Sequence, residues 1–187
     1  MKIAKFLTDS ILTPIVFLTS VAFVEAATIH SSKSSVVVTF KQEGVAVPAN
    51  FKNVSGTIDF DAANPANSKA QIAVALTSFD LGEPEYNKEV QKKEWFNSAQ
   101  FPQATFVSSD IKSAGAGKLV AQGKLTIKGK ALDVSVPIAF KQEGKTQVFE
   151  GQLPIKRLFF NIGEGEWKDT DILADEVVIK FKVVTNQ

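Results

Sequence analysis

"KLVAQGKLTIK", residues 118–128, alternates small or apolar residues with polar ones almost without interruption. The two sets are Leu119, Ala121, Gly123, Leu125 and Ile127, against Lys118, Gln122, Lys124, Thr126 and Lys128. Successive side chains of a β-strand point to opposite faces, so a period of two places the first set together on one face. The stretch is therefore predicted to be a strand with one buried face and one face in water.

Seven further segments show the same period, and turn residues separate them. They are 35–41, 50–61, 69–79, 104–112, 132–140, 147–156 and 176–184. Short alternating segments with turns between them are typical of an all-β fold. Eight strands with one polar face each fit a sandwich or an up-and-down barrel, and only closure removes the exposed edges. Eight is also the number of strands whose barrel can hold one small ligand.

The interval from Pro84 to Asn97 is the one segment with helical features. Pro84 suits the first turn of a helix, and charged residues oppose Val90 and Trp95 on the other face. We expect one short helix that caps or flanks an end of the β-structure.

Residues 1–26 have the features of a secretory signal peptide. Two lysines precede an apolar run from Ile11 to Val24, and Ala26 offers a small-residue cleavage site. That run is shorter than the ~20 residues that a membrane-spanning helix needs. We expect cleavage after Ala26, which leaves residues 27–187 as a single secreted domain.

The composition excludes several kinds of site. The chain has one histidine, His30, and no cysteine, so a histidine-based triad, a zinc centre and disulfides all lack their parts. A nucleic-acid surface is not expected, since Arg157 is the only arginine and 21 basic residues nearly balance 20 acidic ones. We predict a protein without catalytic activity, cofactor or metal ion.

Carboxylates crowd the segment that precedes the last strand. They are Glu164, Glu166, Asp169, Asp171, Asp175 and Glu176. Such a group is able to bind a hard cation or to supply the carboxylate pair of a glycosidase. The segment lacks the EF-hand pattern and Lys168 interrupts it, so the interpretation we favour is a solvated acidic loop.

The aromatic residues are unusually apolar, with 15 Phe and only one Tyr, Tyr86. A packed β core also uses phenylalanine. Small residues such as Ala70, Gly56 and Gly123 nevertheless fall on the faces predicted to point inward. They leave a channel or merely fit the taper of a filled barrel, and the pattern allows both.

Several segments together carry a resemblance to a known family. They are "FKNVSGTIDFD", "LTSFDLGEPEYNKEV", "EWFNSAQFPQATFVSS", "GKLTIKGKALDV" and "LPIKRLFFNIGEGEWKDTDILADEVVIKF". In this order, over nearly all of residues 34–184, they resemble the YceI-like family of secreted lipid-binding proteins. The resemblance implies a lipocalin-like antiparallel barrel of eight strands, a periplasmic location, and an elongated cavity for a polyisoprenoid or another long acyl-type chain. The "GEGEWKDT" segment is similar to a branch that occurs beside membrane cytochromes of the b type, which implies such a cytochrome as a partner and a quinone tail as one ligand.

With this resemblance, the candidate ligand-binding residues fall into three groups. The wall is assigned to Phe40, Phe60, Leu76, Phe106, Ile127, Val136, Phe140, Phe149, Ile155 and Phe181. One end is assigned to Trp95, Phe96, Phe101, Phe160 and Trp167. Arg157 is the candidate for a ligand head group, because its planar fork suits phosphate or carbonyl oxygens; the alternative is a surface ion pair with the acidic loop.

These observations predict a periplasmic, non-enzymatic carrier for a long apolar ligand. No nucleic acid is expected among its partners. The alternative hypothesis is a filled barrel with a structural or interaction role, docked on a membrane redox partner.

Overall fold

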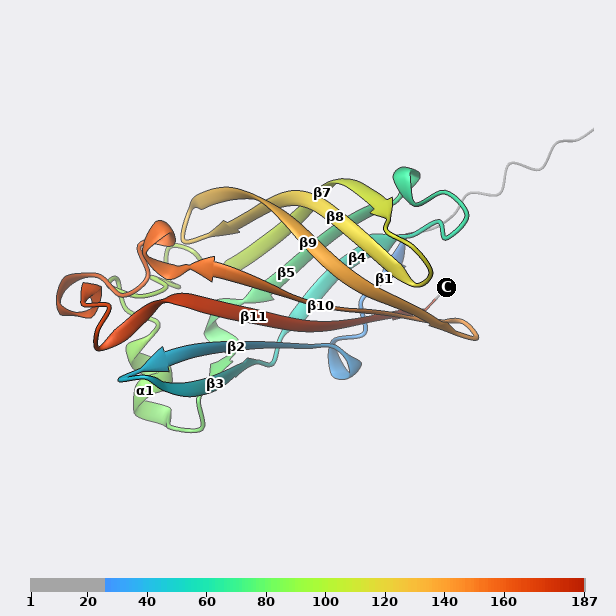
Figure 1. The fold of residues 1–187 in the computed structure, drawn as a ribbon. Helices are drawn as coiled ribbons and strands as arrows, with labels where there is room; N and C mark the ends of the chain where they lie inside the picture. Colours follow the sequence, from blue (N-terminus) through green and yellow to red (C-terminus); the bar gives the residue numbers. More distant parts are fainter. Residues whose placement is uncertain (1–25, 187) are drawn as a thin grey trace, which may run out of the picture.

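The computed structural model describes residues 26–186, which form one antiparallel sheet of eleven strands with a single short α-helix (Figure 1). The all-β prediction is confirmed. The predicted signal peptide lies, except for Ala26, outside the described residues. Within residues 26–186 no helix is long and apolar enough to cross a membrane.

The elements follow one another along the chain with short connections. The strands are β1 (Ala27–Thr28), β2 (Ser35–Gln42), β3 (Val45–Phe51), β4 (Val54–Asp59), β5 (Lys69–Ala75), β6 (Phe79–Asp80), β7 (Gln103–Ser113), β8 (Lys118–Ile127), β9 (Lys130–Glu143), β10 (Thr146–Lys156) and β11 (Leu173–Asn186). The helices are α1 (Pro84–Glu89) and five 3-10 turns, η1 (Ser31–Lys33), η2 (Pro65–Asn67), η3 (Leu76–Ser78), η4 (Arg157–Phe160) and η5 (Gly165–Lys168).

The predicted number of eight strands is wrong. The segment predicted as one strand, 50–61, contains the end of β3 and the whole of β4, and β3 begins earlier, at Val45. A two-residue turn at Glu43 and Gly44, both with positive φ, returns the chain from β2 into β3 and pairs the two strands. Strands β1 and β6 have two residues each, too few for a period of two to be recognised in the sequence.

The predicted helix is also shorter than expected. Helix α1 ends at Glu89, and the chain then passes through turns to Asn97, which has a positive φ of 50°. The side chain of Asn87 ties α1 to β6, because its amide donates to Asp80 and its oxygen accepts from the Leu81 N–H. Lys52, Asn87 and the Gly82 N–H lower the pKa of Asp80 to about 2, so this tie holds at neutral pH.

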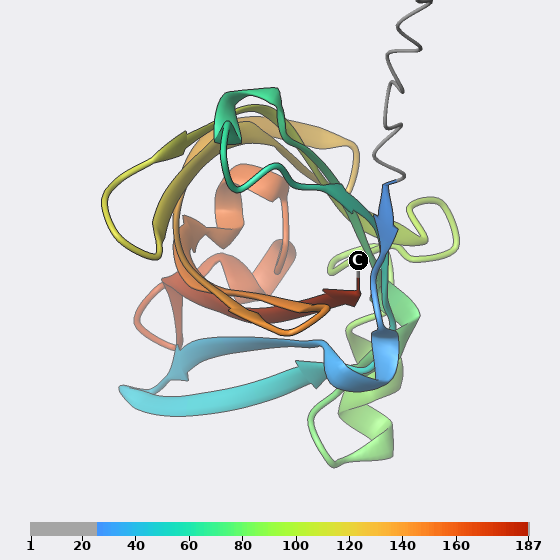
Figure 2. The ribbon, with the colours of Figure 1, turned by 90° about the vertical axis from the view of Figure 1, so that its right-hand side faces the viewer.

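The sheet curls around one apolar core (Figure 2). Its strand order is β1-β4-β5-β7-β8-β9-β10-β11-β2-β3-β6. Ile29, just after β1, forms a bridge with Thr185 of β11, so two distant parts of the sheet order meet at one end of the molecule. Close approach inside the curl requires small residues: a Cβ on Gly123 would lie 2.4 Å from the Val107 oxygen and 2.7 Å from the Phe106 ring.

One pair of neighbouring strands separates partway along its length. Strands β9 and β10 are paired from the hairpin to Ile138 and Gly151, and no further. Beyond that point β9 continues against β8 as far as Lys130, while β10 continues against β11 as far as Lys156. We call the point of separation, at Ile138 and Gly151, the fork, and the space between the two diverging strands the seam (Figure 1).

Two prolines account for the fork. The Phe140 N–H donates to Gly117 on the β8 side, so the odd-numbered residues of β9 direct their backbone groups toward β10. In the observed register the two residue numbers of each β9–β10 pair add up to 289. If this register continued past the fork, Pro137 would lie opposite Gln152, and Pro154 would lie opposite Ser135. Each of these two pairs lacks one N–H donor, because proline has none. The ladder therefore weakens where the strands begin to diverge.

Replacing Pro137 and Pro154 together with valine would return both donors. We expect β9 and β10 then to pair beyond the fork, and the Ser135 amide to exchange its hydrogen more slowly. The measurement is residue-resolved hydrogen exchange, with Pro48→Val in β3 as the control. Unchanged exchange at Ser135 would mean that side chains in the seam, and not the prolines, hold the strands apart.

Candidate functional site

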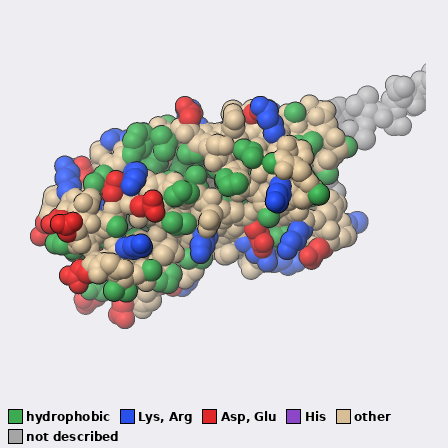
Figure 3. Space-filling model, in the orientation of Figure 1, with side chains coloured by type: hydrophobic (Ala, Val, Ile, Leu, Met, Phe, Trp, Pro, Cys, Tyr) green, Lys and Arg blue, Asp and Glu red, His purple; other side chains and the backbone are tan. Residues whose placement is uncertain are grey.

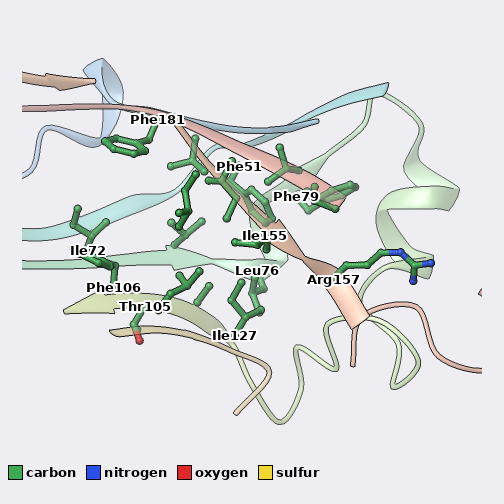
Figure 4. A pocket seen from close by; sticks show the side chains of 18 of the residues that line it. Phe51, Ile72, Leu76, Phe79, Thr105, Phe106, Ile127, Ile155, Arg157 and Phe181 are labelled. Atoms are coloured by element: carbon green, nitrogen blue, oxygen red, sulfur yellow. The ribbon is translucent and has the colours of Figure 1, made fainter. Parts of the chain in front are cut away.

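A cavity of about 280 Å³ lies inside the curled sheet (Figure 4). A single buried water molecule requires only ~10–15 Å³ on this scale, so the interior is hollow. The side chains that line it are almost all hydrocarbon; the polar exceptions are Gln42, Tyr86, Glu89, Thr105 and Arg157, with the indoles of Trp95 and Trp167. Such a lining favours an apolar occupant.

The alternation of apolar and polar residues along the strands determines which side chains line the cavity. In β8 the predicted inward residues Leu119, Ala121, Leu125 and Ile127 are all buried and all line the cavity. Gly123, on the same face, leaves room for the ring of Phe106 from β7. Figure 4 places Arg157 and Phe181 at opposite ends of the space, which makes the cavity elongated along the strands.

Most of the predicted wall residues line the cavity. They are Phe40, Phe60, Leu76, Phe106, Ile127, Val136, Phe149, Ile155 and Phe181. Phe140 does not: its ring packs 4.6 Å from that of Phe60 and 5.1 Å from that of Phe149. The three rings pack together near the β9–β10 hairpin. Phe140 thus contacts two residues of the cavity wall without lining the cavity itself. A role of the lining residues in binding stays a prediction.

The predicted end group is only partly assembled. Trp95, Phe96 and Trp167 line the cavity, and the two indole rings pack with centroids 5.3 Å apart. Phe101 packs instead beside Gly129 of the β8–β9 turn, where an added Cβ would lie 2.8 Å from its ring. Phe160 is fully buried against Phe159 in η4. Both lie in turns, where a period of two does not fix the direction of a side chain.

Arg157 is buried, with 2% of its surface exposed, and its guanidinium donates five hydrogen bonds to backbone carbonyls. The acceptors are Ala174 (from Nε, 3.1 Å), Ile162 and Gly163 (from Nη1, 2.8 and 3.2 Å), and Trp167 and Leu173 (from Nη2, 2.7 and 2.6 Å). An arginine side chain has five N–H donors, so none is left for a ligand head group. Arg157 therefore borders the cavity and holds together the loop 161–172 and the start of β11.

Both sequence interpretations of Arg157 need correction. No carboxylate of residues 26–186 forms an ion pair with it, and Asp175 instead accepts a hydrogen bond from the Leu158 N–H at 3.0 Å. Burial lowers the pKa of the guanidinium from its ordinary value, and the charge of Asp175 opposes that shift. The sequence does not reveal this role, because every residue type has a backbone carbonyl and the acceptors therefore cannot be recognised from their side chains.

The carboxylates of the acidic loop do not come together at one site. Glu164 pairs with Lys128 at 3.1 Å, and this hydrogen bond lowers the pKa of Glu164. Asp169 accepts from the Asp171 N–H within the loop itself. In the part of the chain that the structure describes, no three His, Cys, Asp or Glu side chains come together as metal ligands.

The sequence did not predict which polar groups line the cavity and are available to a ligand. Tyr86 and Glu89 of α1 and Gln42 at the end of β2 line the cavity next to the tryptophan pair. The indole Nε1 of Trp95 is buried without a hydrogen-bond partner among residues 26–186. Trp95 was nominated only for its ring, and its unpaired N–H depends on tertiary packing that the sequence does not show.

Replacing Arg157 with lysine tests its structural role. Lysine has three donors, so at least two buried carbonyls lose their partner, at about 1–3 kcal/mol each. We expect a loss of unfolding free energy of about 2–6 kcal/mol in urea titrations, and a blue-to-red change in tryptophan emission as the Trp95–Trp167 pair loosens. Lys156→Met, at the exposed neighbouring position, is the control. Equal stability of the two variants would contradict the assignment.

Comparison with known proteins agrees with this architecture. A family model described as the YceI-like domain matches residues 28–185. Protein YceI of Escherichia coli O157:H7 is 34% identical over 118 residues, which cover 60% of this chain and 61% of that protein. A UPF0312 protein of Photorhabdus laumondii is 34% identical over 95 residues, 51% of this chain and 49% of that protein. The alignments thus span about half to three fifths of these relatives.

Solved structures share the fold. The crystal structure of Burkholderia cenocepacia BcnA is 51% identical, with a TM-score of 0.81 over 83% of this chain and 98% of that chain. A polyisoprenoid binding domain from Saccharophagus degradans is 15% identical, with a TM-score of 0.68 over 86% of this chain and 98% of that chain. At that identity the second similarity concerns the fold alone. Since the family model covers nearly the whole described chain, the protein belongs to the family of YceI-like domains.

Proposed function

We propose that the protein binds one long apolar chain, of isoprenoid or acyl type, in the cavity of the curled sheet and acts as a carrier without catalysing a reaction. The observation that carries the proposal is the cavity itself, about 280 Å³ with an almost entirely hydrocarbon lining. A polar substrate would lose its hydration there without gaining hydrogen bonds. The description of the S. degradans domain as polyisoprenoid-binding is consistent with this ligand class.

The shape of the cavity favours a chain over a compact ligand. It extends between Arg157 at one end and Phe181 at the other, with side chains of β2, β5, β7, β8 and β10 along its length (Figure 4). A linear chain gains about 0.8 kcal/mol for each buried methylene, whereas association costs an estimated ~4–15 kcal/mol. A chain of about ten carbons therefore barely offsets that cost, and one of about twenty binds well.

The filled barrel that the sequence also allowed is the weaker hypothesis. Its premise is a packed interior, and the small residues Gly56, Ala70, Ala121 and Gly123 would then only fit the taper of the wall. Ala70 and Ala121 line the cavity instead, beside the larger Ile72 and Leu119. A hollow of this size forfeits packing contacts, which is a cost that ligand binding recovers.

The location and partners belong to the same proposal. A cleaved signal peptide at residues 1–26 would deliver the carrier to the periplasm, where a long apolar chain needs protection from water to leave a membrane. A quinone tail is one member of the ligand class. A membrane cytochrome of the b type stays a prediction that rests on the sequence resemblance.

Ligand length gives a direct test. Delipidated protein titrated with saturated fatty acids of 10 to 20 carbons should bind about fourfold more tightly for each added methylene, until the cavity is full. The signal is the fluorescence of Trp95 and Trp167, which line the cavity, with calorimetry as a second measurement. Equal affinity across the series would exclude an apolar chain as the ligand.

A matched pair of variants tests the place of binding. Val74→Thr puts a hydroxyl of nearly unchanged size into the cavity wall, while Val107→Thr puts one on the exposed outer face of β7. We expect the first to weaken binding of a long fatty acid by about 1 kcal/mol, roughly fivefold, since the hydroxyl is desolvated beside the chain. The second should bind like the unmodified protein. Equal effects of both variants would place the ligand elsewhere.

A further inference from the structure

A second hollow, the outer groove, lies on the outside of the sheet. It has a volume of about 660 Å³ and crosses β8, β9, β10, β11 and β2. Pro137, Ala139, Gly151 and Gln152 line it, so it lies at the fork between β9 and β10. Figure 3 shows apolar side chains exposed across the middle of this face, with basic and acidic side chains around them.

A thin layer separates the outer groove from the cavity. Leu119, Ile138 and Phe181 line both spaces. Ile138 and Phe181 belong to the inward faces of β9 and β11, yet both are only half-buried. At the fork, therefore, one layer of side chains stands between solvent and the end of the cavity opposite Arg157 (Figure 4).

Gly151 keeps this layer thin. A Cβ at this position would lie 2.5 Å from the Pro137 oxygen and 2.6 Å from the Phe181 ring, so Gly151 adds no side chain to this layer and the ring of Phe181 lies against its backbone. Beyond the fork the two strands have no further ladder to break, because Pro137 and Pro154 remove donors from their facing edges. Leu119, Ile138 and Phe181 are thus the side chains that separate the two spaces at the fork.

The charges around the outer groove are mostly positive. Lys118, Lys180, Lys182 and Glu150 line it, and Lys182 lies 3.7 Å from Glu150. Neither Lys118 nor Lys180 forms an ion pair with any carboxylate of residues 26–186. Glu89 and the buried Arg157 border the opposite end of the cavity, and backbone carbonyls already accept hydrogen bonds from all five donors of Arg157. Among the residues that line the two spaces, those of the outer groove therefore offer an acidic head group more unpaired positive charge than those of the opposite end.

From these observations we infer that the fork is a lateral entrance: the ligand is an amphiphile whose phosphate or carboxylate head lies in the outer groove between Lys118 and Lys180, and whose tail passes Ile138 and Phe181 into the cavity. This inference rests on the proposed function and adds the route, the head-group site and the sign of the head group. The tail then runs toward the Trp95–Trp167 pair, which closes the other end.

Closing the fork tests the route. The chain has no cysteine, so Pro137→Cys with Gln152→Cys introduces one defined pair, joined by oxidation or by a short bis-methanethiosulfonate reagent. We expect uptake of hexadecyl phosphate, followed by stopped-flow tryptophan fluorescence, to slow by at least about tenfold when the pair is joined and to recover on reduction. The control pair is Gln122→Cys with Ser135→Cys, on exposed positions of the intact β8–β9 ladder. Equal uptake rates of the joined fork and the joined control would overturn the inference.

Reversing charges tests the head-group site. Lys118→Glu with Lys180→Glu should weaken hexadecyl phosphate by at least about tenfold and leave hexadecanol within about twofold, and salt should reduce the difference. The matched control is Lys88→Glu with Lys168→Glu, two exposed lysines of α1 and η5 near the other end. A larger effect of the control variant would place the head at the α1 end and overturn the inference.

The two levels of proposal fail differently. If the unmodified protein binds neither hexadecyl phosphate nor hexadecanol, the proposed function is wrong. If it binds both and neither the joined fork nor the reversed lysines change uptake or affinity, the function stands and the lateral entrance is wrong.

Discussion

The guanidinium of Arg157 is the interaction on which one whole end of the molecule depends. It gathers the carbonyls of Ile162, Gly163 and Trp167 from the loop 161–172 and those of Leu173 and Ala174 from the start of β11. Buried carbonyls without partners are costly, so the loop is held in one shape as long as the five bonds persist. Trp167, one of the acceptors, is thereby held against Trp95 in the lining of the cavity.

This anchoring of the loop matters because the sheet surrounds a cavity. A wall around empty space lacks the dispersion contacts of a packed core, and the described chain has no disulfide to compensate. Stability must come from the long ladders of β7 to β11 and from clusters at the ends, such as the rings of Phe60, Phe140 and Phe149.

The sequence predicted the middle of this molecule far better than its ends. Alternation in β8 and β9 assigned the inward residues because a strand has only two faces, and a wrong face would expose every apolar residue at once. Phe101 and Phe160 were misplaced because turns obey no such period. Arg157 was misread because its partners are backbone atoms, and β1, β6 and the early start of β3 were missed because two residues or an interrupting Pro48 give no clear pattern. The family resemblance supplied the ligand class, which no spacing of residues contained.

The prolines of β9 and β10 have one more consequence, for the behaviour of the protein at high concentration. Two strand edges that diverge inside a sheet are templates onto which a strand of another molecule could add, the first step of aggregation. Here Pro137 and Pro154 each interrupt the row of donors that an incoming strand would need. The residues that keep the sheet open thus also make it a poor partner for its own copies.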